Sequence, residues 1–375
     1  MSIDRGRVVS PGRVNLLGEH VDYNDGIVLP AAIDRFVSIH FHRTTDPNVT
    51  LYARDMGEEC SFDPRQLANK TALDGSPLPG WAMYPAGVIW NLLNYDLPVE
   101  GFSADFFSDI PIGAGLSSSA AVEVGFAVVC EALGDWQLDR MTLARICQEA
   151  EREYVGVNCG LMDQFACACG VADHVVMLDT RSLFYKPIPL PPDTGIVIAD
   201  STLRRALVNS AYNERRQDCD RAVAHFQNID PAIRALRDLT PELFYTAEND
   251  LPSDVYRHAL HVVEEIARVN EAIHLLEQND AQGFGRLMLE THRSLSDLYE
   301  VSLPELDILV ESAAGLEGCL GARLTGAGFG GCTVNLVQKD HIDNFIERLG
   351  EIFTAKTGLQ AQIFATKPSN GASLS

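Results

Sequence analysis

The 375-residue chain has few basic side chains for its size. It contains 29 Lys and Arg against 52 Asp and Glu, which gives a formal net charge of −23. Nucleic acids and anionic membranes both require a basic surface on the protein that binds them, so this composition argues against both as partners. An acidic chain that uses an anionic ligand has to hold it through local dipoles, a metal ion and a few cations.

The sequence also lacks a membrane-spanning run, a secretory segment and a disulfide pattern. No stretch is long and apolar enough to cross a bilayer. The nine cysteines are odd in number and scattered. Cys167 and Cys169 stand near His174, but the ligand spacing is wrong for zinc and their neighbours are small and apolar, so we interpret them as packed thiols. These features predict a cytoplasmic protein with reduced thiols.

The apolar content of 46 % is high enough for substantial cores, and a chain of 375 residues suits two domains. A proline-rich stretch lies at 187–192. We therefore predict one domain over 1–190, a second over 191–366 and a disordered tail over 367–375.

Hydrophobic periodicity predicts a mixed first half and a mainly helical second half. In the first half we expect strands at 7–10 (ended by Pro11-Gly12), 27–32, 35–42, 49–53, 102–107 and 175–178, with helices at 85–95, 120–133, 141–154 and 161–170. In the second half we expect strands at 195–200, 319–324, 332–337 and 360–365, with helices at 205–226, 255–278, 281–299, 305–314 and 341–353. The β-turn-β-α-β ending is typical of an α+β fold.

Residues 111–121, Pro-Ile-Gly-Ala-Gly-Leu-Ser-Ser-Ser-Ala-Ala, join a glycine loop to the start of a helix. Glycines favour unusual backbone angles, and serines are natural N-cap residues. Such a loop presents free N–H groups and the positive end of a helix dipole, which attract phosphate. No lysine follows the glycines, so this is not a Walker A loop. The loop is therefore either a phosphate site or a flexible turn into a buried helix. If it is a phosphate site, its ligands are Gly113, Ala114, Gly115, Leu116, Ser117, Ser118 and Ser119.

A second glycine cluster spans 324–332, Leu-Thr-Gly-Ala-Gly-Phe-Gly-Gly-Cys. Gly326, Gly328 and Gly331 fit a dinucleotide-binding pattern, but that loop must open a helix and the residues that follow here are strand-like. We therefore expect a hairpin. Either its bare backbone at Gly326, Gly328 and Gly330 closes over a phosphate or sugar, or it is an ordinary tight turn.

Glu151 and Asp163 lie on either side of a helix break at 156–160, so both can point into one cavity. Phosphoryl transfer requires such a set, with one carboxylate on Mg²⁺ and another near the attacking hydroxyl. Asp163 is a charge within an apolar run and therefore needs a partner. Glu151 is also compatible with a solvated helix face shared with Glu149 and Glu153.

Residues 19–26, Glu-His-Val-Asp-Tyr-Asn-Asp-Gly, are rich in ionisable side chains and end in a turn sequence, so they belong in a loop. Arg13 lies just before this loop. Carboxylates clustered with an imidazole can hold sugar hydroxyls through charge-assisted hydrogen bonds. The alternative is a surface loop with ordinary charges.

These motifs, in this order, resemble the galactokinases of the GHMP small-molecule kinase family. Residues 11–26 are similar to the galactokinase signature, 111–121 to the phosphate loop, 159–164 to the segment with the catalytic aspartate and 324–332 to the third motif; 210–216 and 292–307 also fit. The resemblance implies a two-domain α+β GHMP kinase fold. Its N-terminal domain is similar to domain 2 of ribosomal protein S5 and its C-terminal GHMP domain is ferredoxin-like, with the active site between them.

The resemblance further implies ATP-dependent phosphorylation of the anomeric hydroxyl of galactose, with ATP and Mg²⁺ as cofactors, in a monomer. By position, Asp163 meets that hydroxyl and Arg13 stabilises charge beside it. The sugar is bound by Glu19, His20, Asp22, the Gly160 backbone and the Tyr212 hydroxyl. The loop from Gly113 to Ser119 wraps the ATP phosphates, while Ser119 and Glu151 hold Mg²⁺.

Two departures from the family pattern concern the choice of sugar. Only ten residues precede Pro11, where typical members have a longer segment, and Arg205 stands where the family usually has His. Arabinose, galacturonate and N-acetylgalactosamine stay open as substrates, although Glu19 and His20 favour a sugar with a C6 hydroxyl. A catalytically silent sugar sensor is the alternative from another class, and the intact serines and Asp163 argue against it.

Overall fold

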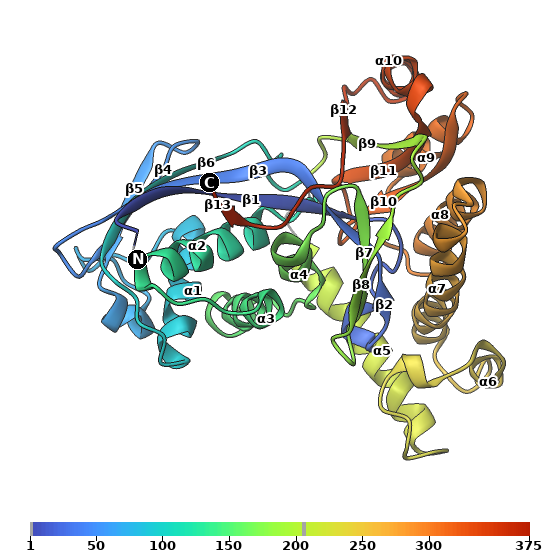
Figure 1. Cartoon of the computed structure of the whole chain (residues 1–375). Coiled ribbons are helices and arrows are strands. Elements are labelled where there is room, and N and C mark those ends of the chain that lie inside the picture. The colour runs from blue at the N-terminus through green and yellow to red at the C-terminus, as the bar shows by residue number, and fades with distance from the viewer. Residues whose placement is uncertain (1–2, 205–207) are drawn as a thin grey trace.

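The computed structural model describes residues 3–204 and 208–375 of the chain. Over these residues the chain forms a long twisted sheet with helices on one face, a smaller sheet with its own helices, and a short three-stranded sheet between them (Figure 1). This arrangement agrees with the α+β fold expected from the sequence.

The long sheet has six strands in the order β13-β1-β3-β6-β4-β5, and only the β4–β6 pairing is parallel among those described. The strands are β1 (Arg5–Asn15), β3 (Pro30–Arg43), β4 (Val49–Ala53), β5 (Glu58–Phe62), β6 (Phe102–Ser108) and β13 (Ser373–Leu374). Helices cover one face of this sheet: α1 (Met83–Asn94), α2 (Ser118–Gly134), α3 (Arg140–Ala150) and α4 (Met162–Cys169) (Figure 1). A sheet packed on one face explains the alternating burial along β6.

Strand β1 continues through Pro11-Gly12, so the predicted break there is wrong. Its pairing with β3 shifts register between Pro11 and Arg13, which marks a β-bulge. The Arg13 N–H donates to the Leu116 carbonyl at 3.1 Å, and a Cβ on Gly12 would lie 2.7 Å from that same oxygen. The glycine therefore permits close approach of the 111–121 loop to the strand.

The three-stranded sheet has the order β2-β7-β8 and consists of β2 (Ile27–Val28), β7 (His174–Asp179) and β8 (Tyr185–Pro189). The expected strands at 27–32 and 35–42 are in fact the short β2 and the long β3. Strand β8 occupies part of the proline-rich stretch, where the sequence indicates no strand. Prolines are tolerated there because β8 lies at the edge of its sheet.

The smaller sheet is antiparallel, with the order β10-β11-β9-β12. Its strands are β9 (Thr194–Asp200), β10 (Cys319–Thr325), β11 (Cys332–Gln338) and β12 (Gln362–Thr366), and α8 (Ala281–Asp297), α9 (Pro304–Ala314) and α10 (Ile342–Thr357) pack against them. Helix α8 lies very close to β10 at Gly285, where a Cβ would lie only 2.1 Å from the Leu320 carbonyl oxygen. The absence of a side chain at Gly285 permits this close approach.

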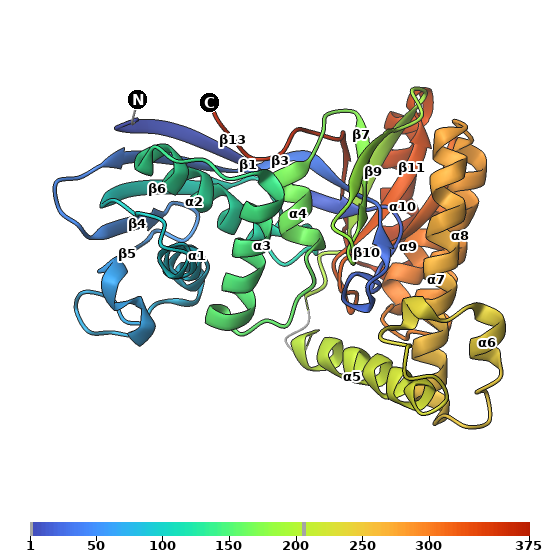
Figure 2. The same ribbon diagram turned by 60° about the horizontal axis from the view of Figure 1, so that its bottom comes forward.

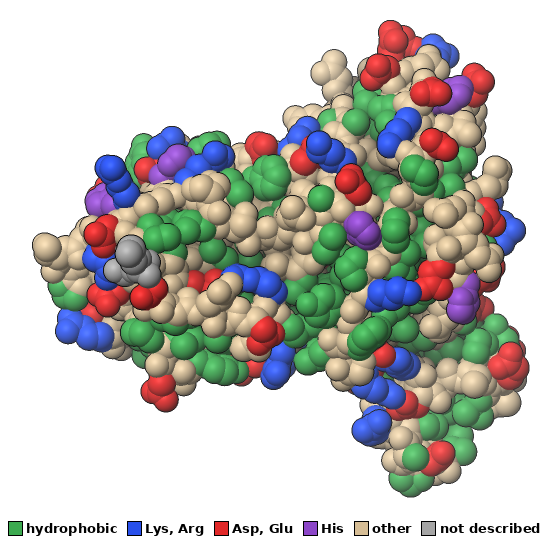
Figure 3. Space-filling model, in the orientation of Figure 1, with side chains coloured by type: hydrophobic (Ala, Val, Ile, Leu, Met, Phe, Trp, Pro, Cys, Tyr) green, Lys and Arg blue, Asp and Glu red, His purple; other side chains and the backbone are tan. Residues whose placement is uncertain are grey.

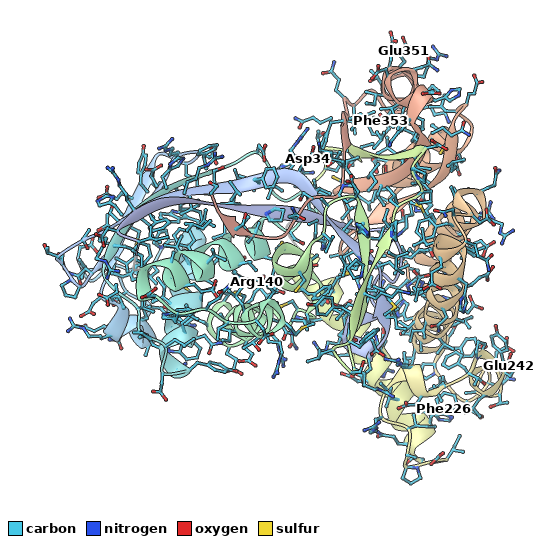
Figure 4. All side chains as sticks on the ribbon, in the orientation of Figure 1. Asp34, Arg140, Phe226, Glu242, Glu351 and Phe353 are labelled. Carbon is cyan, nitrogen blue, oxygen red and sulfur yellow. The ribbon has the colours of Figure 1, made fainter. Side chains whose placement is uncertain are left out.

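Helices α5 (Val208–Gln227), α6 (Pro241–Tyr245) and α7 (Ser253–Glu277) complete this half, and α7 runs beside α8 (Figure 2). Phe226, labelled in Figure 4, lies with its ring centroid 5.6 Å from that of Phe244, which stacks on Tyr256 at 5.0 Å. The start of the helix expected at 205–226 falls outside the described residues. Short helical segments are Asp22–Asn24, Pro64–Asn69, Gly80–Ala82, Glu151–Val155, Leu236–Asp238 and Lys339–His341.

The tail over 367–375 is not disordered, which corrects the expectation from its composition. Strand β13 pairs with β1 through Val8–Leu374 and Val9–Ser373. Just before it, the Gly371 N–H donates to the Gly170 carbonyl at 2.9 Å, and a Cβ at Gly371 would lie 2.3 Å from the Ala168 oxygen. The tail therefore returns to the N-terminal sheet and lies alongside β1 (Figure 1).

On the face drawn in Figure 3, acidic and basic side chains are interspersed among apolar ones. Within residues 3–204 and 208–375, no helix has the length and apolar content needed to cross a membrane.

Candidate active site

Asp163, in the first turn of α4, is held by Arg13 of β1 and Ser117 at the start of α2. Arg13 Nε donates to Asp163 Oδ1 at 2.8 Å, and a second guanidinium nitrogen lies 2.6 Å from the same oxygen. Ser117 Oγ donates to Asp163 Oδ2 at 2.6 Å. The Arg13 side chain is 4 % exposed and that of Asp163 is 31 % exposed. The expected partner of Asp163 is thus Arg13, and the carboxylate keeps an open side.

Arg13 also ties Asp163 to the 111–121 loop, because its Nη1 donates to the Gly115 carbonyl at 2.5 Å. Ser117 does not cap its helix as the sequence suggests. Its backbone is left-handed, with φ at 58°, and its hydroxyl makes no capping hydrogen bond. The bond to Asp163 occupies that hydroxyl instead.

Glu19 is buried in a hydrogen-bond network whose members lie far apart in the sequence. Its Oε2 accepts from Asn15 Nδ2 at 2.8 Å and from Arg323 Nη2 at 2.5 Å, and its Oε1 accepts from the Gly326 N–H at 2.7 Å. Arg323 is fully buried on β10. A buried carboxylate and guanidinium need each other, because either charge alone in the core is strongly unfavourable. The pair therefore fixes Glu19 against the glycine hairpin.

Asp22 and Gly160, both expected to bind the sugar, lie in direct contact. A Cβ on Gly160 would lie 1.7 Å from Asp22 Oδ2, so only glycine fits beside this carboxylate. Burial, and then the negative charges of Asp163 and Glu19, raise the pKa of Asp22 from 3.8 to about 7. His20 lies on the other side, with its ring centroid 5.4 Å from that of Tyr212. Burial lowers the His20 pKa to about 3, so its imidazole is neutral.

These side chains line one cavity of about 160 Å³. It brings together Arg13, Glu19, His20, Asp22, Glu151, Asp163 and Tyr212, together with Val157, Cys159, Met162, Gly326 and Ala327. Gly160 contributes through its contact with Asp22 rather than as part of the lining. The cavity is rich in carboxylates, hydroxyl and imidazole groups, which is the chemistry that binds a polyhydroxylated molecule.

The two glycine clusters pack against each other, main chain to main chain. A Cβ on Gly331 would lie 2.7 Å from the Ala114 oxygen, and one on Gly326 would lie 2.9 Å from the Gly115 oxygen. The 324–332 segment is a hairpin turn between β10 and β11, as expected, and not the start of a helix. A second cavity of about 280 Å³ lies here, lined by Gly113, Gly115, Leu203, Arg204, Thr325, Ala327, Gly328, Phe329, Gly330 and Gly331.

Ala327 lines both cavities, so the two are neighbours. In the second cavity Arg204 is held by Asp200 through bonds of 2.8 and 2.6 Å, and its Nε donates to the Ile112 carbonyl at 2.9 Å. The guanidinium thus lies beside the 111–121 loop. Backbone N–H groups in left-handed glycine turns, together with one fixed cation, are suited to a phosphate chain.

Glu151 belongs to a buried acidic pair and is not part of a solvated face. Gln164 Nε2 donates to Glu151 Oε2 at 2.6 Å and to Glu123 Oε2 at 2.8 Å. Burial, together with the Glu151 charge, raises the pKa of Glu123 well above its ordinary value. The Ser119 hydroxyl bonds to Glu151, which joins this carboxylate to the start of α2. These hard oxygen donors suit Mg²⁺.

Sequence reasoning missed four residues of this site: Arg204, Arg323, Glu123 and Glu265. Glu265 of α7 accepts from the Gly18 N–H at 2.8 Å and so anchors the 19–26 loop. Glu265 lies beside other charged residues of its helix and Arg204 lies in a loop, so the pattern gives no sign that either belongs to the site. Arg323 and Glu123 carried a signal, because each is a charge within an otherwise apolar strand or helix.

Comparison with known proteins first defines the class. The model of the N-terminal domain of GHMP kinases matches residues 83–171, and that of the C-terminal domain matches residues 272–355. The structure is similar to mevalonate kinase of Methanococcus jannaschii, with a TM-score of 0.67 at 20 % identity over 98 % of this chain and 99 % of the other. The fold and both domains are therefore those of a GHMP kinase.

The relatives then define the family. A galactokinase galactose-binding signature matches residues 3–43. The chain is 43 % identical to a galactokinase of Roseiflexus sp. (97 % of this chain, 91 % of the other) and 40 % identical to one of Fusobacterium nucleatum (98 % and 94 %). A crystal structure of Lactococcus lactis galactokinase complexed with galactose has a TM-score of 0.92 at 34 % identity (99 % and 95 %). The chain belongs to the galactokinase family.

Proposed function

We propose that this chain transfers the γ-phosphoryl group of ATP to the C1 hydroxyl of galactose, giving galactose 1-phosphate and ADP. The observation that supports this most strongly is the adjacency of the two cavities, because a sugar beside Asp163 then meets phosphates held between the glycine loops. Phosphoryl transfer is mainly a matter of such positioning and of charge stabilisation.

Asp163 orients the C1 hydroxyl and accepts its proton as the oxygen–phosphorus bond forms. A carboxylate is too weak a base to ionise a sugar hydroxyl beforehand, but a loose transition state does not require that. Arg13, bonded to the same carboxylate, supplies a fixed positive charge beside the transferring group.

Mg²⁺ belongs at Ser119 and Glu151. Among the described residues no group of three or more His, Cys, Asp and Glu side chains suits a metal ion, so a site made by protein carboxylates alone is not found. Mg²⁺ typically takes one or two carboxylates and completes its shell with phosphate oxygens and water. When bound, Mg²⁺ neutralises charge on the phosphates. Ser119 and Glu151 would hold the ion in place.

The sugar is held by Glu19, His20, Asp22, Tyr212 and the Gly160 segment. The buried carboxylate of Glu19 accepts from a C6 hydroxyl, which arabinopyranose lacks. Galacturonate brings a further carboxylate into a cavity that already contains Glu19, Asp22 and Asp163, and like charges at this distance repel. Galactose therefore fits the cavity better than either.

The test is ADP release from Mg-ATP with galactose, glucose, arabinose, galacturonate and N-acetylgalactosamine, with the product identified by ³¹P NMR. We expect galactose to have the highest kcat/KM and a single phosphate signal on C1. Higher kcat/KM for another sugar would reassign the substrate, while nucleotide binding without turnover on any sugar would indicate a sensor.

The location and assembly of the protein are part of this proposal. All nine cysteines are free, and seven of them are buried, which suits a reducing cytoplasm. We propose a monomer as its assembly. Sedimentation of the purified protein tests the assembly.

A further inference from the structure

A series of hydrogen bonds leads from His20 into the interior. It runs away from the cavity beside Asp163, which we call the sugar cavity. His20 Nδ1 lies 2.8 Å from the Tyr23 hydroxyl, which lies 2.6 Å from the Tyr299 hydroxyl. Cys219 Sγ lies 3.8 Å from that hydroxyl. At its other end, His20 Nε2 lies 3.3 Å from the Ala327 carbonyl, in the glycine hairpin.

The Ala327 carbonyl determines which atom donates in every hydrogen bond of this series. A carbonyl oxygen only accepts, so His20 Nε2 carries the proton that bonds to Ala327. A neutral imidazole then has a bare Nδ1, which must accept from the Tyr23 hydroxyl. Tyr23 has used its one proton, so its oxygen accepts from Tyr299, and the Tyr299 oxygen accepts from the Cys219 thiol. Every donor points toward His20.

The residues around these hydrogen bonds are packed so that the bonded side chains have little freedom to move. Tyr299 is fully buried, and its ring lies against His261 at 4.6 Å and His258 at 5.7 Å between ring centroids. Neither Tyr23 nor Tyr299 is among the residues that line the sugar cavity. His20 itself has a left-handed backbone with φ at 63°, a strained conformation for a residue other than glycine and one often found at functional sites.

We propose that Tyr23 and Tyr299 are positioning residues that lock His20 in the tautomer with the proton on Nε2, so that His20 presents a hydrogen-bond donor to the sugar. The proposal rests on the assignment of His20 to sugar binding. It adds two residues that never touch the substrate, one of them contributed by the segment after α8. The Nε2–H bonds to Ala327 in the free protein and is then available to a sugar oxygen, which must be an acceptor.

The experiment reads the tautomer directly. Protein labelled with ¹⁵N-histidine, with the His20 signal assigned by its loss in His20→Gln, is compared with Tyr23→Phe and Tyr299→Phe by ¹H–¹⁵N correlation spectra. We expect a single Nε2–H pattern in the wild type. Tyr23→Phe removes the donor to Nδ1 and should give a mixture with Nδ1–H; Tyr299→Phe should give a smaller shift in the same direction.

Kinetics of the same variants supply the functional readout. KM for galactose should rise about three- to tenfold in Tyr23→Phe, the worth of one net hydrogen bond, while KM for ATP and kcat stay within about twofold. Tyr95→Phe is the matched control, since it removes an exposed phenol hydroxyl at the C-terminal end of α1 that bonds to Glu149 at 2.7 Å. It should change none of these quantities.

Three results would overturn the proposal, and the first two are an Nδ1–H or mixed tautomer in the wild type and an unchanged tautomer and galactose KM in Tyr23→Phe. A changed tautomer with an unchanged galactose KM would also reject the positioning role. The spectra are recorded without sugar. Failure of the wild type to phosphorylate galactose would therefore refute the proposed function and leave the tautomer result to decide the hydrogen-bond chain by itself.

Discussion

The two cavities of the site differ in what lines them: side chains line the sugar cavity, and mostly main chain lines the neighbouring cavity between the glycine loops, which we call the phosphate cavity. The sugar cavity is lined mostly by side chains, several of them buried and charged. One of them, Glu19, is held from behind by Arg323, which is 304 positions further along the chain. The phosphate cavity is made mostly of main chain, because glycines on both loops allow carbonyl and N–H groups to approach each other. Under the proposed function, selective binding of a sugar depends on a fixed network of side chains, and phosphate binding depends on the absence of side chains.

The largest expected effect lies where the cavities meet. Asp163→Asn removes the proton acceptor and the charge partner of Arg13, while the size of the side chain is kept. We expect kcat to fall about 10²- to 10⁴-fold, the usual worth of a positioned general base, with galactose KM changed far less. Steady-state kinetics measure it. Asp343→Asn on the exposed face of α10 is the control, and near-normal turnover of Asp163→Asn would refute the base role.

The next largest effect concerns the sugar network. Arg323→Met removes a fully buried cation and leaves Glu19 with Asn15 and the Gly326 N–H as its bonding partners. We expect the free energy of unfolding in urea to fall by about 3–5 kcal/mol. Arg348→Met, which breaks an exposed pair with Glu351, should cost less than about 1 kcal/mol. Equal losses in the two variants would show that the buried pair has no special role.

A smaller effect is expected in the phosphate cavity. Gly331→Ala places a Cβ 2.7 Å from the Ala114 oxygen, at a φ of 81° that alanine rarely adopts, so the two loops must separate. We expect KM for ATP to rise about tenfold. Gly358→Ala is the control, because it has the same backbone problem, with φ at 74°, but no atom within 4 Å. If both variants lower stability equally and neither changes KM for ATP, loop packing does not determine nucleotide binding.

A further expected effect is on the pH dependence of stability. The pKa of Asp22 is raised to about 7 in the folded protein, so between about pH 4 and pH 7 the folded state binds more protons than the unfolded state. Stability from this group is therefore lost as pH rises through that window. Asp22→Asn removes the loss, so its Tm relative to wild type should increase from pH 5 to pH 8. Parallel Tm curves would contradict the raised pKa.

The sequence predicted the parts of this molecule that depend on local pattern. The hydrophobic periodicity at 85–95, 255–278 and 341–353 matched α1, α7 and α10 to within a few residues. Strand β8 pairs with its neighbour β7 and was missed because of its prolines, whereas β13 was missed because it is defined by its distant partner β1. Pro11-Gly12 was misinterpreted for the same reason: its role depends on the loop that approaches it.

The site shows the same division. Asp163, Arg13 and Glu19 lie in motifs, and the contacts around them agree with a shared cavity. Glu265 could not be found, because it lies beside other charged residues of its helix, whereas the apolar stretch around Glu123 indicates its burial but not its partner. Ser117 was assigned to helix capping, yet the carboxylate of Asp163 competes for its hydroxyl from another helix. Roles set by tertiary contacts escape a linear pattern.

The difference between the two cavities is tested most directly by measuring both KM values in Gly331→Ala and Asp22→Asn. We predict that Gly331→Ala raises KM for ATP and leaves KM for galactose within about twofold, and that Asp22→Asn does the reverse. If each variant raised both KM values to a similar extent, the separation into a side-chain sugar cavity and a main-chain phosphate cavity would be wrong.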